Sequence, residues 1–274
     1  MSKMPEYSSA EKYIMIVFNT DLDNTMIYSY KHDIGDDKLC AEIYQGREIS
    51  FVTKKTSELL KAVNSAVMLV PTTTRTFEQY RRIDLGFGVP KYALVCNGGV
   101  LLEDGKEDEE WYRESLRLTV DCREQLLFAA EILEKDASRT LDVRNIRDLF
   151  VFTKCDEPLR SVEVLQNKLD SSLVDVFNNG VKVYVVPKKL SKGVAVSRFK
   201  KKVGADFVIA AGDSEFDISM LCAADLAIAP RELADRTALP ETSFICSDEE
   251  IFSEKVLERV LEIAKNDFST SYGA

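Results

Sequence analysis

The sequence predicts an α/β fold built on a Rossmann-like parallel sheet, because strand-length apolar runs alternate with segments of helical character along the 274-residue chain. The apolar runs lie at 13–20, 66–71, 92–97, 205–212 and 226–230. Strands of a parallel sheet are buried on both faces, so they read as nearly continuous apolar runs. The chain is 45% hydrophobic, which is enough to build the core of one large domain or of two smaller ones.

Helices are expected between these strands, where apolar residues recur at three- and four-residue spacing. The expected helices cover 54–64, 76–84, 214–223 and about 249–265. Residues 26–52 differ, since two short apolar segments flank "HDIGDD" and a third follows "QG". We interpret this stretch as a hairpin flap.

The middle of the chain predicts a separate α+β module at 105–187, inserted into a core formed by 1–104 and 188–274. Its expected helices are at 118–135 and 158–170, and its expected strands are at 149–154, 174–178 and 181–186. The acidic turn "EDGKEDEE" and the polar segment "PKKLSKG" mark its two edges.

Composition excludes several classes of function. At a formal net charge of −10, no basic face of the kind that binds nucleic acid is obvious in the sequence, and no apolar run is long enough for a membrane-spanning helix. The N-terminus "MSKMPEYSSAEK" is polar, so no signal peptide is expected. Six cysteines without a CxxC pair predict reduced thiols and a cytoplasmic location. A single histidine, His32, excludes a multi-histidine zinc site.

Polar residues follow the ends of several predicted strands. Asp21 and Asp23 end the first strand, Thr73 follows the second, and Asp213 follows a late strand, with Asp217 four residues further on. Ligands of parallel α/β sheets bind beyond the carboxyl ends of the strands. Carboxylates gathered at one rim repel each other unless a cation joins them, and an all-oxygen cluster suits Mg²⁺.

Such a rim suits phosphoryl transfer. A carboxylate beside Mg²⁺ can attack phosphorus, and a second carboxylate can protonate the leaving oxygen. A lysine and a hydroxyl are needed to meet the charge of the transferred group. Lys192, which opens a predicted helix, is the candidate lysine, with Lys188 and Lys189 as competitors. Thr73 is the candidate hydroxyl, although its register against Thr72 and Thr74 stays open.

Four segments together resemble the motifs of the haloacid dehalogenase-like hydrolases, and they occur in the same order. These segments are DLDNT (21–25), the Thr73 segment, Lys192 and GDSEFD (212–217). The insertion between the second and third motifs resembles the C2 cap subclass, which includes Cof-like sugar and cofactor phosphatases and sucrose-phosphate phosphatases. The segment "VCNGGVLL" (95–102) is similar to the one that precedes the cap in Cof-like members.

The resemblance implies a role for each motif residue. Asp21 is the expected nucleophile and a metal ligand, and Asp23 is the expected general acid/base, with its backbone carbonyl on the metal. Thr73 and Lys192 hold the phosphoryl oxygens, helped by backbone N–H groups near Asn24 and Thr74. Asp213 and Asp217 complete the Mg²⁺ site.

Three positions depart from the family pattern. Asn24 and Thr74 stand where glycines are usual, and Phe216 stands where an asparagine is usual. Asn tolerates a left-handed backbone, whereas the β-branched Thr74 restricts its turn. Phe216 exchanges a polar contact for an apolar wall. We interpret Arg75 as more structural than phosphate-binding.

These features predict an Mg²⁺-dependent phosphatase that acts on a small phosphorylated metabolite, plausibly a sugar phosphate, through an aspartyl-phosphate. Two alternatives stay open: a phosphomutase-like phosphotransferase, and a non-catalytic module that binds metal or phosphate. The expected partner is a small phosphate ester, without nucleic acid or membrane. Neither the substrate nor the oligomeric state follows from the sequence.

Overall fold

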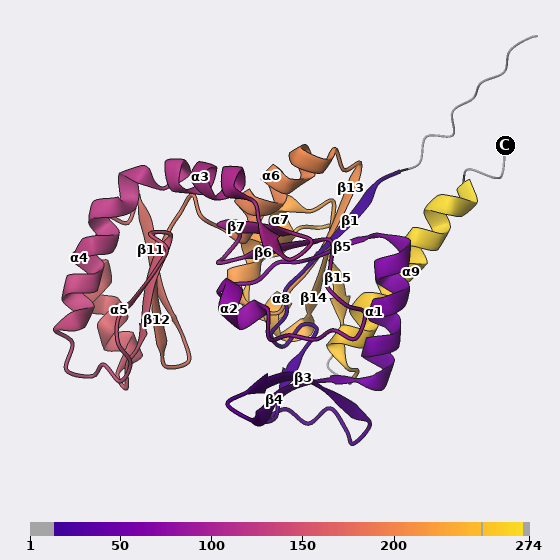
Figure 1. The fold of residues 1–274 in the computed structure, drawn as a ribbon, viewed down its shortest axis with the longest axis horizontal. Coiled ribbons are helices and arrows are strands. Elements are labelled where there is room, and N and C mark those ends of the chain that lie inside the picture. The colour runs from indigo at the N-terminus through magenta and orange to yellow at the C-terminus, as the bar shows by residue number, and fades with distance from the viewer. Residues whose placement is uncertain (1–13, 248, 271–274) are drawn as a thin grey trace, which may run out of the picture.

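The computed structural model describes residues 14–247 and 249–270. The polar N-terminal segment that bears on a signal peptide lies outside this range, as does the start of the strand predicted at 13–20. No helix of the described part is long and apolar enough to cross a membrane. Figure 1 shows a larger body around a central sheet, a smaller body to its left, and a hairpin below.

The central sheet is parallel, as predicted, with the order β15-β14-β13-β1-β5. Its strands are β1 (Ile16–Thr20), β5 (Met68–Pro71), β13 (Phe207–Ala211), β14 (Leu226–Pro230) and β15 (Phe244–Cys246). Thr20 pairs with Ala211 on one side and with Pro71 on the other. The carboxyl ends of β1, β5 and β13 therefore lie at one rim.

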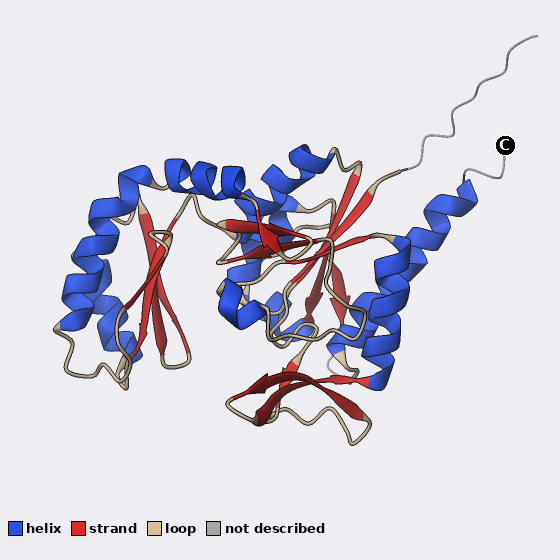
Figure 2. Cartoon of the chain, viewed as in Figure 1, coloured by secondary structure: helices blue, strands red, loops and turns tan. Residues whose placement is uncertain are grey.

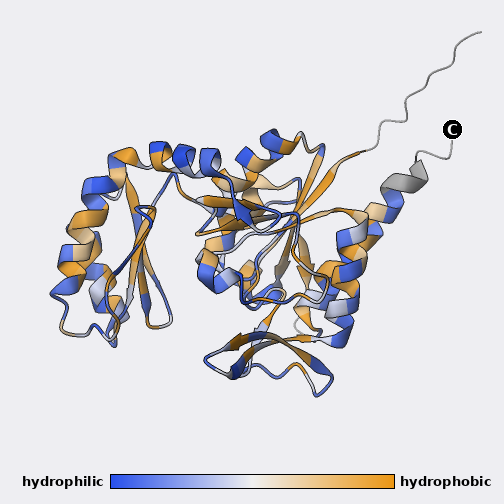
Figure 3. Cartoon of the chain, viewed as in Figure 1, coloured by the Kyte–Doolittle hydropathy of each residue, from blue (hydrophilic) through white to orange (hydrophobic). Residues whose placement is uncertain are grey.

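Helices cover both faces of this sheet (Figures 1 and 2). Alternate strand residues pack on one face with α1 (Lys54–Ala66) and α9 (Phe252–Thr270), and on the other with α6 (Lys192–Val203) and α7 (Ile218–Ala223). The short helix α8 (Arg231–Arg236) follows β14. In Figure 3 the strands of this sheet are mostly orange, as burial on both faces requires.

Several predicted elements are shorter than expected. The helix predicted at 76–84 is only α2 (Phe77–Tyr80), and the one predicted at 214–223 divides into a 3₁₀ turn (Glu215–Asp217) and α7. The strand predicted at 92–97 ends at Val95 as β6 (Tyr92–Val95). It belongs to an antiparallel sheet with β7 (Val100–Glu103) and β8 (Lys106–Glu107), and one bridge from Thr72 to Leu94 joins it to the main sheet.

A second sheet has the order β11-β12-β10-β9. Its strands are β9 (Arg144–Ile146), β10 (Phe150–Lys154), β11 (Val174–Asn179) and β12 (Lys182–Pro187). One face packs against α4 (Arg123–Glu134) and α5 (Pro158–Gln166), and the other face is turned toward the larger body (Figure 1). α5 ends at Gln166, four residues earlier than predicted.

The helix predicted at 118–135 is broken. The predicted range holds a 3₁₀ turn (Val120–Cys122) and α4, and α3 (Glu109–Leu118), which was not predicted, precedes them. The indole of Trp111 on α3 is buried among residues of the central sheet, and its Nε1–H donates to the Gly98 carbonyl at 2.9 Å. The chain changes direction after α3 because this helix is held by the larger body while α4 covers the second sheet.

Residues 26–52 do contain a hairpin. β3 (Lys38–Tyr44) and β4 (Arg47–Thr53) are antiparallel, and β2 (Tyr28–Ser29) pairs with β4. Gln45 and Gly46 both have positive φ, 51° and 74°, which suits the tight turn of a two-residue hairpin.

Candidate active site

The centre of the site is a buried lysine between two aspartates. The Lys192 Nζ donates to Asp21 Oδ1 at 2.5 Å and to Asp217 Oδ1 at 2.6 Å. Lys192 is 1% exposed and Asp217 is fully buried. Asp21 follows β1 directly, and its N–H donates to the Ala211 carbonyl at the end of β13. The first helical turn of α6 therefore delivers a cation to the rim where β1 and β13 end.

The competing lysines lie elsewhere. Lys188 pairs with Asp175 and Lys189 with Asp121, and all four side chains are exposed. The predicted choice of Lys192 therefore agrees with where the chain places each lysine. The sequence signal was the helix start, where Ser191 accepts a hydrogen bond from the Val194 N–H at 3.3 Å.

A tight loop after β13 brings Asp213 and Asp217 to the same rim. Asp217 Oδ2 accepts from the Ser214 hydroxyl at 2.8 Å and from two backbone N–H groups of the loop. Gly212 is required here, because a Cβ at this position would lie 2.3 Å from the Asp217 Cβ. Asp213 Oδ1 accepts from the Thr25 hydroxyl at 3.0 Å, which ties this loop to the first motif.

Asp21, Asp213 and Asp217 together form a set of oxygen donors that fits a metal. One carboxylate oxygen from each lies within 4.8 Å of the others. If all three are ionised, they carry three negative charges, and Lys192 neutralises one. A divalent cation would balance the remaining two, and a hard oxygen donor set suits Mg²⁺.

The pKa values of these acids reflect their crowding. Burial raises the pKa of Asp21 well above its ordinary value, and Lys192 opposes this while the neighbouring carboxylates add to it. Burial and the Asp217 charge raise the pKa of Asp213 to about 7. The Lys192 pKa is raised in turn, because Asp21 and Asp217 outweigh the burial of its ammonium. Without a cation, the site therefore favours protonated carboxyls.

Asp23 lies apart from the buried cluster and is held by Arg75. The guanidinium donates to both Asp23 oxygens, from Nε at 2.7 Å and from Nη2 at 2.6 Å. Burial raises the pKa of Asp23, but these hydrogen bonds and the positive charge outweigh it and lower the pKa overall. The Asp23 side chain is still about half exposed, so a ligand can reach it.

The same arginine contacts a residue that the sequence did not reveal. Arg75 Nη1 donates to Glu42 Oε2 at 2.9 Å, and Glu42 also accepts from Arg82 and from the Ser50 hydroxyl. Glu42 is only 1% exposed, although it sits on β3 of the hairpin. A charged residue in a predicted surface hairpin gives no sequence signal of this burial, because the pairing spans 33 positions.

The three consecutive threonines after β5 have side chains in different surroundings. Thr72 Oγ1 points inward, accepting from Asn19 and donating to the Val70 carbonyl. Thr73 is buried, and its Oγ1 accepts from the Arg75 N–H at 3.2 Å. Thr74 lines a small pocket. Thr72 is therefore excluded as the candidate phosphate-binding threonine, and Thr73 and Thr74 remain.

The first-motif turn corrects one expectation. Asn24 adopts the left-handed conformation predicted for it, with φ 61°. Its N–H, however, donates to the Ile27 carbonyl at 2.8 Å and is not free for phosphate. Its side chain instead hydrogen-bonds Asp213. In the described part of the chain, the N–H groups of Asp23 and Thr74 have no hydrogen-bond partner.

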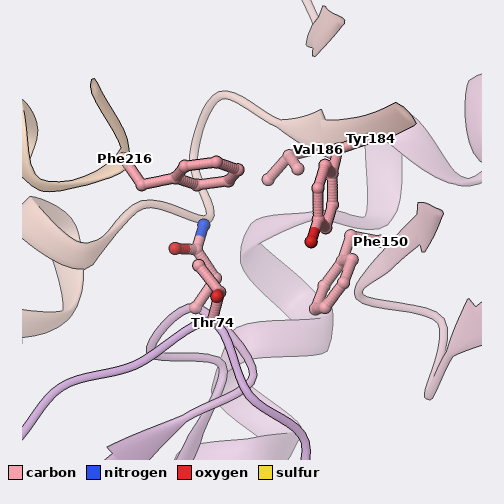
Figure 4. Close-up of a pocket in the computed structure, with 6 residues that line it drawn as sticks. Thr74, Phe150, Tyr184, Val186 and Phe216 are labelled. Atoms are coloured by element: carbon pink, nitrogen blue, oxygen red, sulfur yellow. The ribbon is translucent and has the colours of Figure 1, made fainter. Parts of the chain in front are cut away.

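The pocket beside Thr74 is roofed by the second sheet, as Figure 4 shows. Its lining residues come from both bodies: Thr74, Asn97, Phe150, Tyr184, Val186 and Phe216. The Phe216 ring meets Phe177 edge-on at a centroid distance of 4.5 Å and Tyr184 at 5.3 Å. The departure at Phe216 therefore provides an apolar contact between the loop after β13 and the second sheet.

The family model of haloacid dehalogenase-like hydrolases matches residues 106–246, just over half of the chain. The chain belongs to this family of hydrolases. The matched range contains Lys192, Asp213 and Asp217, and their contacts with Asp21 and Thr25 bring the first motif to the same place.

Individual relatives agree with this assignment. A phosphoglycolate phosphatase of Sulfurisphaera tokodaii is 28% identical over 204 residues, covering 72% of this chain and 78% of that protein. The sucrose-phosphatase of Synechocystis has a similar fold, with a TM-score of 0.62 at 15% identity over 91% of this chain and 98% of that one. A Thermoplasma acidophilum protein is similar with a TM-score of 0.56 at 11% identity, covering 92% and 99% of the two chains.

Proposed function

We propose that this protein is an Mg²⁺-dependent phosphatase that hydrolyses a small phosphorylated metabolite through an aspartyl-phosphate on Asp21. The observation that carries the proposal is the buried set of Asp21, Asp213, Asp217 and Lys192 at the carboxyl end of the sheet. The relatives named as phosphatases of phosphoglycolate and of sucrose phosphate support the same class of substrate.

Asp21 is the proposed nucleophile. Its carboxylate attacks phosphorus, and the bond between phosphorus and the leaving oxygen breaks. Lys192 donates hydrogen bonds to the same region and stabilises negative charge there. Asp21, Asp213, Asp217 and the Asp23 carbonyl would hold Mg²⁺, which when bound would supply charge stabilisation to the phosphoryl oxygens.

Asp23 is the proposed general acid and then base. Its half-exposed carboxyl faces the space between the two bodies, where a leaving group would sit. In its protonated form it gives a proton to the leaving oxygen, and in the ionised form that its lowered pKa favours it then takes one from the water that cleaves the aspartyl-phosphate. Arg75 orients this carboxyl by holding both of its oxygens.

The remaining polar groups bind the phosphoryl oxygens. The Thr73 hydroxyl accepts from the Arg75 N–H, so its own proton can be donated to a ligand. The unpaired N–H groups of Asp23 and Thr74 can donate in the same way. We assign residues 105–187 as the cap that closes over the substrate and excludes water.

The test is phosphate release from a panel of phosphorylated metabolites and one aryl phosphate, with Mg²⁺ or with chelator. Asp21→Asn should lower kcat by at least about a thousandfold, as loss of a nucleophile does. The matched control is Asp235→Asn, an exposed aspartate on α8, which should leave kcat unchanged. If no compound, including the aryl phosphate, is hydrolysed by the wild type, the protein is a binding module and the proposal is wrong.

A further inference from the structure

The face of the second sheet that is turned toward the larger body carries its residues in ordered rows. Because strand residues alternate between faces, this face presents every second residue of each strand. One cross-strand row contains the apolar residues Ile146, Phe150 and Val186 and ends at Asp175 on β11. The next is mainly aromatic, and the last, farthest from the connections to the larger body, is basic and polar.

The aromatic row is well packed. Phe152, Tyr184 and Phe177 pair across the strands, and their rings stack at centroid distances of 5.5 Å and 5.7 Å. Arg144 ends this row, with its Cζ 5.9 Å from the centre of the Phe152 ring. These rings make a flat wall, and Phe216 from the larger body closes one side of it.

The basic row places two lysines directly opposite each other. Lys154 on β10 pairs with Lys182 on β12 in the antiparallel register. Like charges in directly opposed positions destabilise a sheet. In the described part of the chain, no carboxylate lies within ion-pair distance of Lys154, Lys182 or Arg144. The one acidic residue on this face of the strands, Asp175, is paired with Lys188.

The basic row of this face is therefore cationic in a protein whose formal net charge is −10. The surroundings of Lys182 show which charged groups lie near its ammonium. Its pKa is lowered, chiefly because neighbouring atoms desolvate its ammonium, while Asp23 opposes the shift and Lys154 and Arg75 add to it. Lys182 remains accessible to solvent, so a ligand can reach it. Lys182 thus lies near Asp23, on the leaving-group side of the site, and Lys154 is its neighbour in the sheet.

We propose that Lys154 and Lys182 bind an anionic group on the alcohol portion of the phosphate ester, so that the substrates are phosphorylated metabolites with a second negative charge. The second charge is a carboxylate or a second phosphate. This inference rests on the proposed phosphatase function.

The test compares substrates matched in size and different in charge. Phosphoglycolate carries a carboxylate, 2-hydroxyethyl phosphate carries a neutral hydroxyl, and ethylene glycol bisphosphate carries a second phosphate. Wild-type kcat/KM should be about tenfold or more higher for a charged compound than for the neutral one. The better of the two charged compounds identifies the second group.

The Lys154→Met and Lys182→Met variants keep most of the length of the side chain and remove its charge. Each should lower kcat/KM for the charged compounds while leaving the value for 2-hydroxyethyl phosphate within about twofold, and together they should abolish the preference. The matched control is Lys168→Met, an exposed lysine that follows α5 on the other side of the second sheet. Equal rates for charged and neutral compounds in the wild type, or a preference that survives in both variants, overturns the subsite.

A binding measurement separates this inference from the proposed function. Calorimetry with phosphonoacetate and with ethylphosphonate, in the presence of Mg²⁺, requires no turnover. The carboxylate-bearing phosphonate should bind more tightly, and Lys182→Met should remove the difference. If phosphate release is absent but this difference is found, the subsite holds and the phosphatase function fails; if release occurs without the difference, the reverse is true.

Discussion

The rim of the central sheet and the facing side of the second sheet differ in whether their charged side chains are paired. At the rim of the central sheet, Asp21 and Asp217 are buried and their charges are satisfied by Lys192 at 2.5 Å and 2.6 Å. On the facing side of the second sheet, Lys154 and Lys182 are accessible, and no carboxylate of the described residues lies within ion-pair distance of either lysine. A buried charge must be paired within the fold, whereas an accessible one can remain for a ligand.

The difference suggests a division of labour. The rim holds the groups proposed for chemistry, and their rigidity comes from mutual hydrogen bonds between segments far apart in the sequence. The second sheet holds groups proposed for substrate selection, and its aromatic row packs next to them. Changes at the rim should therefore affect every substrate, and changes on the second sheet should affect substrates selectively.

The largest effect is expected from metal removal, because the metal would bind the carboxylates of the rim. Chelation of divalent cations should abolish phosphate release, and added Mg²⁺ should restore it, because two of the negative charges of the buried carboxylates then lose their counter-ion. Phosphate release measured after dialysis against chelator, before and after addition of Mg²⁺, checks this. Full activity in the chelated protein would exclude a metal role for Asp21, Asp213 and Asp217.

The pH dependence of stability sharpens the same point. Between the ordinary Asp pKa of 3.8 and the value of about 7 for Asp213, the metal-free folded state holds a proton that the unfolded chain has lost. This group therefore makes the metal-free protein less stable as pH rises through that range. Protons also compete with the cation, so Mg²⁺ should raise Tm more at pH 8 than at pH 6. Thermal unfolding at the two pH values measures this, and an equal rise at both would contradict it.

A smaller effect is expected at Glu42, which connects the hairpin to the rim. Glu42→Gln weakens the hold on Arg75, so Asp23 loses part of its orientation. We expect kcat for an alkyl phosphate to fall by about tenfold, a small part of the roughly 10²–10⁴-fold that an acid–base group contributes. An aryl phosphate should be less affected, because its leaving oxygen has less need of a proton.

The control for Glu42 is Glu48→Gln, an exposed glutamate on the same hairpin. Because Glu42 is buried between two arginines, its loss can also cost about 3–5 kcal/mol of stability. Unfolding in urea gives the folded fraction, to which the rates are normalised. Equal losses for alkyl and aryl substrates would mean that Glu42 has only a structural role.

The smallest effect is expected at Phe216, where the two surfaces touch. Phe216→Asn restores the residue of the family pattern and removes the edge contacts with Phe177 and Tyr184. Aromatic pairs contribute about 0.5–1.5 kcal/mol each, so the low end for the two pairs together, about 1 kcal/mol, should raise KM by roughly fivefold with little change in kcat. Steady-state kinetics measure this against Phe128→Asn, an exposed residue of α4. A fall in kcat with unchanged KM would place Phe216 in the chemistry instead.

The sequence by itself determined the α/β class and the parallel core, because strands buried on both faces leave continuous apolar runs. It also indicated the acidic residues of the rim, since β1 is followed at once by Asp21 and β13 by Asp213 after a single glycine, and it favoured Lys192 from its position at a helix start. These signals are local: each can be recognised within a few residues of the chain.

Only the tertiary structure decided the rest. The break between α3 and α4 arises because Trp111 is buried against the larger body, and β6 leaves the main sheet because it pairs with β7. Burial of Glu42 and the opposition of Lys154 to Lys182 depend on register and on contacts across the fold. Pairing energies of this kind depend on where distant segments meet, and no local pattern of apolar and polar residues contains that information.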